Sequence, residues 1–70
     1  MTKEEARQQF IAVITTEGSA YSPQIAEEAW QDVLDYVAAR EPIYYELAIY
    51  ISPEVQEVLG IADWIYTVDG

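Results

Sequence analysis

Residues 22–41 limit the possible folds more than any other part of the chain. Ser22-Pro23 is typical of a helix start, because a serine side chain caps the first free N–H groups and proline suits the first helical position. Along the residues that follow, apolar side chains fall on one half of the helical circumference and polar side chains on the other. Arg40 suits the negative end of a helix dipole, and Pro42 prevents continuation. The sequence therefore predicts an amphipathic helix with one buried side.

A second helix is predicted before this one. Thr2 followed by Glu5 forms a capping-box pattern, in which each residue satisfies a backbone N–H near the other. Ala6 and Phe10 then begin an apolar stripe at helical spacing, and Gly18 is a suitable helix stop.

The next part of the chain changes pattern. In residues 43–51 the side chains alternate from Ile43 onwards, and the enrichment in isoleucine and tyrosine favours a β-strand. Ser52-Pro53 repeats the helix-start pattern, and Gly60 ends the short helix that we expect there. Residues 61–68 are again rich in aromatic and β-branched side chains, which is compatible with a second strand or a final helical turn.

These elements predict an α+β fold. Only nine residues separate Ile51 from Ile61, too few for a parallel crossover, so the two strands are expected to pair antiparallel. The predicted domain has two N-terminal helices packed on a small antiparallel sheet, with a short helix between the strands. The alternative is an all-α bundle.

Length and composition indicate how such a domain is held together. The chain has 70 residues, which fits one domain (residues 1–70) with a small core. It contains no cysteine and no histidine, so we expect neither a disulfide nor a structural zinc site. A hydrophobic content of 51%, with two Trp, six Tyr and one Phe, is sufficient for a packed core.

The same composition excludes most catalytic chemistry. The commonest general base and the thiol nucleophile are missing, and the three glycines do not form a phosphate-binding loop. No calcium-binding EF-hand pattern occurs. A glycosidase with two carboxylates remains formally possible, but a chain of this size has little room for a substrate cleft. We therefore expect a non-enzymatic protein without catalytic residues, metal or cofactor.

Charge gives the clearest indication of a partner. Thirteen acidic residues face three basic ones, for a net charge of −10, beyond the magnitude of about 2–8 that suits a small domain. This charge repels nucleic acid and anionic membranes and attracts basic proteins. The polar N-terminus lacks the apolar stretch of a secretory signal, and no run of about 20 apolar residues occurs, so a cytoplasmic location is expected.

Four acidic residues of the amphipathic helix form the principal candidate site. Glu28, Asp32 and Asp35 follow one another at helical spacing, Glu27 flanks them, and no basic residue lies opposite at that spacing. Carboxylates every 5–6 Å or so approximate coarsely the charge spacing of a DNA backbone. We interpret this acidic face as a mimic of nucleic acid that contacts a basic protein. The alternative is an ordinary solvated helix face that maintains solubility.

A secondary candidate is an aromatic patch. Tyr44 and Tyr50, beside Glu46, would share the outer face of the first predicted strand. Aromatic residues are enriched at protein interfaces, so this patch predicts a docking surface or a homodimer contact. The alternative is that these tyrosines lie at the rim of the core with their hydroxyls in water. An interaction module or homodimer using the Tyr/Trp-rich face is thus the alternative function.

In size, acidity and lack of cofactor chemistry, the whole chain resembles the small acidic anti-defence proteins of phages, notably the anti-CRISPR proteins that mimic DNA. The residues that carry this resemblance are Glu27, Glu28, Asp32 and Asp35. It implies an inhibitor that blocks the basic nucleic-acid-binding site of a larger protein, such as a CRISPR effector complex, in the cytoplasm of the host cell. Acyl carrier proteins are similar in size and acidity, but no serine here stands in their Asp-Ser-Leu motif.

Overall fold

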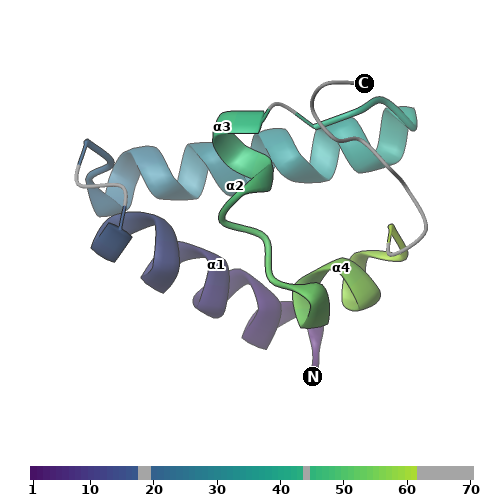
Figure 1. Cartoon of the computed structure of the whole chain (residues 1–70), viewed down its shortest axis with the longest axis horizontal. Coiled ribbons are helices and arrows are strands. Elements are labelled where there is room, and N and C mark those ends of the chain that lie inside the picture. Colours follow the sequence, from purple (N-terminus) through teal and green to yellow (C-terminus); the bar gives the residue numbers. More distant parts are fainter. Residues whose placement is uncertain (18–19, 44, 62–70) are drawn as a thin grey trace.

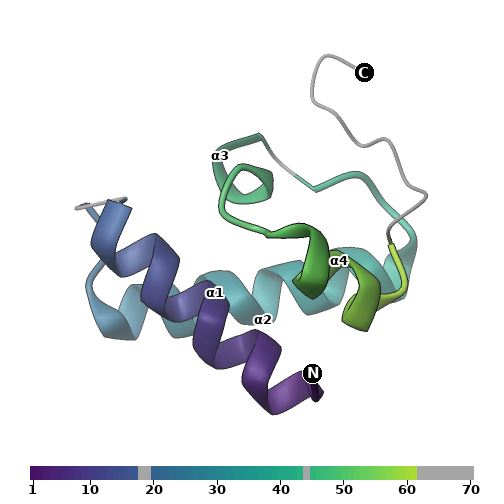
Figure 2. The ribbon, with the colours of Figure 1, turned by 60° about the horizontal axis from the view of Figure 1, so that its bottom comes forward.

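A computed structural model describes residues 1–17, 20–43 and 45–61 of the chain. Over these residues it contains the helices α1 (Lys3–Glu17), α2 (Pro23–Ala39), α3 (Tyr45–Ala48) and α4 (Pro53–Leu59). Helices α1 and α2 meet near their connection and diverge towards their other ends, forming a V (Figure 1). In Figure 1 residues 45–61 pass from α3, which is drawn over α2, to α4 at the open end of the V, and Figure 2 shows α3 and α4 on the same side of α2.

The predicted antiparallel sheet is wrong, because the described residues contain no strand and form a small all-helical fold. The segment expected to be the first strand instead forms α3 and a turn, in which the amide of Ile49 donates to the carbonyl of Tyr45 at 3.1 Å. Ile43, Leu47 and Ile51, four residues apart, are buried, whereas Ile49 is 53% exposed. The apolar side chains therefore meet the core with a helical period of four. The second expected strand, residues 61–68, lies outside the described residues except for Ile61.

The predicted helix starts are confirmed by their hydrogen bonds. The backbone amide of Thr2 donates to Glu5 Oε1 at 2.7 Å, and the amide of Glu5 donates to Thr2 Oγ1 at 3.1 Å, which completes a capping box. Ser22 Oγ accepts from the amide of Ile25 at 3.3 Å. Ser52 Oγ does the same for Val55 at 3.3 Å, so both Ser-Pro pairs act as predicted.

One core joins all four described helices. It includes a contact between Phe10 of α1 and Trp30 of α2, whose ring centroids are 5.4 Å apart and whose planes are tilted by 44°. Helix α4 is tied to α1 by a hydrogen bond in which Ser52 Oγ donates to Gln9 Oε1 at 2.6 Å. The buried side chains are those of Ala6, Phe10, Ile14, Ala26, Ala29, Trp30, Val33, Ile43, Leu47, Ile51, Val55, Leu59 and Ile61.

None of the described helices is long and apolar enough to cross a membrane.

Candidate functional site

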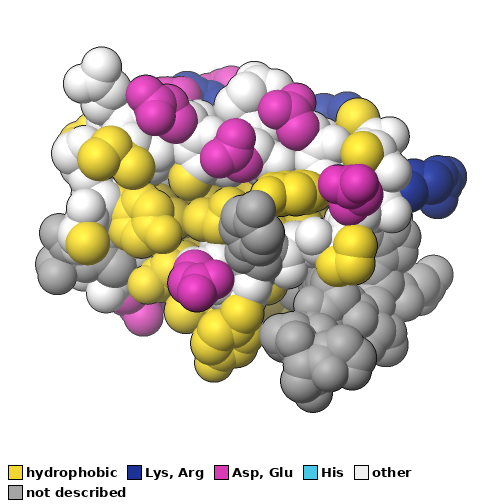
Figure 3. All heavy atoms as spheres, turned by 90° about the horizontal axis from the view of Figure 1, so that it is seen from above, with side chains coloured by type: hydrophobic (Ala, Val, Ile, Leu, Met, Phe, Trp, Pro, Cys, Tyr) yellow, Lys and Arg dark blue, Asp and Glu magenta, His cyan; other side chains and the backbone are white. Residues whose placement is uncertain are grey.

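The predicted acidic face lies on the exposed side of α2. Glu28, Asp32 and Asp35 are all exposed, while Ala29 and Val33 between them point into the core. The clean separation arises because helix α2 packs through a single apolar stripe against α1. A view from above shows acidic side chains in a row on the α2 side of the molecule (Figure 3). The structure thus brings these three predicted residues together on one surface.

Glu27, the fourth predicted residue, is directed elsewhere. Its Oε2 accepts from Arg7 Nη1 of α1 at 2.6 Å. Arg7 Nη2 also donates to Glu4 Oε2 at 3.0 Å, and the hydrogen bonding of Arg7 to Glu4 is the main cause that holds the pKa of the Glu4 carboxyl below its usual range. Glu27 therefore has a basic partner within the fold, and its ion pair links α2 to α1. The sequence pattern missed this pairing because Arg7 and Glu27 are 20 residues apart.

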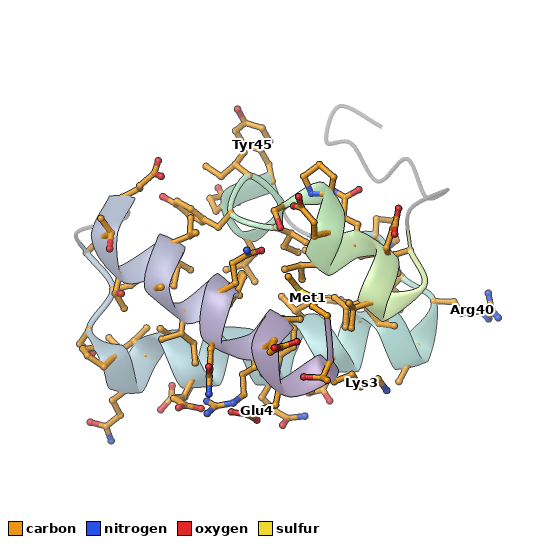
Figure 4. All side chains as sticks on the ribbon, turned by 90° about the horizontal axis from the view of Figure 1, so that it is seen from below. Met1, Lys3, Glu4, Arg40 and Tyr45 are labelled. Carbon is orange, nitrogen blue, oxygen red and sulfur yellow. The ribbon has the colours of Figure 1, made fainter. Side chains whose placement is uncertain are left out.

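The remaining acidic residues of this face have no basic partner. Asp35 Oδ1 accepts a hydrogen bond from Gln31 Nε2 at 3.2 Å, which leaves its charge intact. Glu28 and Asp32 form no ion pair with Lys3, Arg7 or Arg40, which are the chain's three basic side chains and all lie in the described part of the structure. Arg40 points away from the body of the fold at the end of α2 (Figure 4).

A groove beside this row adds a second component to the site. It lies between α2 and α3 and has a volume of about 340 Å³. Glu46, which we had assigned to the aromatic patch, borders the groove together with Glu28 and Asp32. Figure 3 shows a hydrophobic band with acidic side chains on both of its sides. The residues lining the groove are Tyr21, Ile25, Glu28, Ala29, Asp32, Glu46 and Leu47.

The strand that was expected to carry the aromatic patch does not occur among the described residues, so its tyrosines are placed individually. Tyr50 is half-buried, and its ring packs edge-on against Tyr21 at a centroid distance of 6.2 Å. Tyr44 lies outside the described residues. Within residues 45–51, the exposed large apolar side chains are Tyr45 at 58% and Ile49 at 53%, and Tyr45 projects into solvent (Figure 4). A helical period of four in this segment would have identified them.

The described residues contain no group of three acidic side chains close enough to hold a metal ion. Glu28, Asp32 and Glu46 form an exposed, negatively charged border of the groove. No protein-family model matches this chain, and no curated protein or solved structure matches it either.

Proposed function

We propose that this protein is a non-catalytic inhibitor whose acidic face occupies the basic nucleic-acid-binding site of a larger protein, such as a CRISPR effector complex. The observation that carries the proposal is the row of Glu28, Asp32 and Asp35. These carboxylates share one exposed side of α2, and none of them has an ion pair with a basic residue of the chain. We define these three residues as the acidic row.

The spacing of the acidic row supports this proposal. At 1.5 Å rise per residue, its seven-residue span covers about 10 Å along the helix axis. Proteins that bind DNA contact its phosphates largely through lysine and arginine. Carboxylates spaced along a rigid helix can meet several of those basic side chains at once. The fold supports such a contact because α2 is fixed by its cap and by the core, so that the charges are held in place before binding.

Net charge acts in the same direction. The formal charge of −10 speeds the encounter with a cationic surface and disfavours contact with DNA itself. Within the fold, Arg7 is already engaged by Glu4 and Glu27. The uncompensated charge is therefore available to a partner.

A displacement experiment tests the proposal. Duplex DNA on beads is loaded with DNA-binding proteins from cells in which the chain occurs naturally, and the free chain is added. We expect it to release a DNA-binding protein, which mass spectrometry identifies. Changing the acidic row to lysine (E28K, D32K and D35K together) should lower this activity about tenfold, because three exposed ion pairs of about 0.5 kcal/mol each are lost.

The matched control is the triple change E17K, E54K and E57K, which alters the net charge equally but affects exposed residues of α1 and α4. We expect this control to retain most of the activity, and circular dichroism should show both variants folded. Release should also weaken as salt is raised, because screening shortens the range of the attraction. Equal loss in both triple variants would show that only net charge matters, and failure to release any protein from DNA would refute the proposed inhibition.

A further inference from the structure

The groove between α2 and α3 has an apolar interior inside its acidic border. Ala29 and Leu47, each 6% exposed, belong to the core and form its floor. Ile25, which is 47% exposed, and the half-buried Tyr21 stand at its sides. Its volume of about 340 Å³ is at the lower end of the range for small-molecule pockets. The groove therefore has room for an inserted side chain.

We infer that this groove binds a cationic peptide segment of the partner that carries one apolar side chain. The apolar side chain enters beside Ile25 and Leu47, and flanking lysine or arginine groups meet Glu28, Asp32 and Glu46. The inference rests on the proposed function, in which the acidic face contacts a basic protein, and it adds the class of segment that is recognised.

Charge complementarity selects this occupant. Glu46, like Glu28 and Asp32, forms no ion pair with the basic side chains of the chain, all of which are described, so a cationic segment would satisfy the whole border. A DNA backbone offers no apolar group, so mimicry of its charge alone does not require an apolar floor. The apolar floor of the groove instead suits a partner segment in which an apolar side chain lies between basic side chains.

Two other occupants fit the charge poorly. Residues 62–70 contain Trp64 and Ile65 but also Asp63 and Asp69, and they contain no lysine or arginine. A second copy of the chain would bring another net charge of −10 to an acidic border. Both would place negative groups beside Glu28 and Asp32, which like-charge repulsion opposes.

Peptide titration of the full-length chain, followed by amide NMR, tests the inference. The probe is a synthetic peptide with a central leucine flanked on both sides by arginines, and it is compared with the same peptide carrying glycine at the centre. We expect shifts of amides in α2 and α3, and about tenfold tighter binding of the leucine peptide, because the leucine side chain is buried. Ile25→Ser should remove most of this preference. Ile49→Ser, which changes an equally exposed isoleucine that does not line the groove, should leave it intact.

Each contrary outcome identifies a different error. Equal affinity for both peptides, or no binding of either, overturns the groove inference, and the DNA-displacement experiment still decides the proposed function separately. Tighter peptide binding after the change of Trp64 and Ile65 to serine would show that the C-terminal segment is the occupant. Concentration-dependent dimerisation that Ile25→Ser abolishes would assign the groove to a second copy. Either result would also overturn the inference.

Discussion

The guanidinium of Arg7 in α1 donates to the carboxylate of Glu27 in α2 at a distance of 2.6 Å. The same guanidinium holds Glu4 at 3.0 Å, so one cation joins carboxylates from both long helices. The contact divides the acids of α2 into two groups with different roles. Glu27 supports the packing of the helices, whereas Glu28 and Asp32 remain available at the groove.

The contribution of Glu4 to stability should depend on pH. Its pKa is lowered in the folded protein, chiefly by the hydrogen bond from Arg7. A glutamate in the unfolded chain titrates near pH 4.3, so between the two pKa values the unfolded state binds more protons than the folded state. The stabilisation is therefore complete above the unfolded value and is lost as the pH falls through the folded value. We expect the difference in urea midpoint between wild type and Glu4→Gln to be constant above about pH 6 and to shrink below about pH 4.

Urea denaturation followed by circular dichroism across this range measures that difference. The control is the same comparison in an Arg7→Gln background, where the hydrogen bond to Glu4 is missing. In this background Glu4→Gln should change the urea midpoint only slightly at every pH. A pH-dependent difference of the same size in both backgrounds would show that Arg7 is not the cause.

The two serine N-caps should differ in their effect on stability. Ser22→Ala removes a cap hydrogen bond and should cost about 1 kcal/mol in the free energy of unfolding. Ser52→Ala removes an equivalent cap bond and also the hydrogen bond to Gln9, so it should cost about 1 kcal/mol more. A double-mutant cycle with Gln9→Ala isolates the second contribution. Equal losses for the two serine variants, with no coupling to Gln9, would contradict the proposed link between α4 and α1.

The helix starts could be predicted because they depend on residues close in sequence. Thr2 with Glu5, Ser22 with Pro23, and Ser52 with Pro53 each supply a local rule, and the structure confirms them. Residues 43–51 could not be assigned in the same way. Their apolar side chains fit a period of two or of four almost equally well, and packing on α1 and α2 decided between them. A short apolar run is ambiguous for this physical reason.

Part of the candidate site could also be predicted, because it depends on residues that are close in sequence. Glu28, Asp32 and Asp35 lie on one helix, so their common exposure follows from helical spacing. The pairing of Glu27 with Arg7 depends on how α1 crosses α2, which no local pattern reports. The placement of Glu46 at the groove likewise depends on α3 and on its position beside α2. The charge of the surface could thus be predicted, but its apolar groove could not.

The C-terminal ends of α2 and α4 share a backbone geometry that favours glycine. Both helices close with a left-handed residue, Arg40 at φ 59° and Gly60 at φ 74°. In each case the amide of the following residue donates to a carbonyl five positions earlier, from Glu41 to Tyr36 and from Ile61 to Gln56, both at 2.9 Å. The backbone geometry is therefore the same, but only Gly60 adopts it without a steric cost.

Arg40→Gly should raise the free energy of unfolding by about 0.5 kcal/mol, because glycine adopts the left-handed conformation without strain. Two smaller effects oppose this gain: the unfolded chain becomes more flexible, and the helix end loses a favourable positive charge. Gly60→Ala should lower it by about 1 kcal/mol. Among the described residues, no atom beyond the immediate chain neighbours lies within 4 Å of the added methyl group, so we expect this loss to report backbone strain rather than a clash. Arg40→Ala, which removes the charge but keeps the strain, is the matched control. Urea denaturation measures the free energy of unfolding of all three variants. If Arg40→Ala raised it as much as Arg40→Gly, the gain would come from removal of the charge and not from relief of strain.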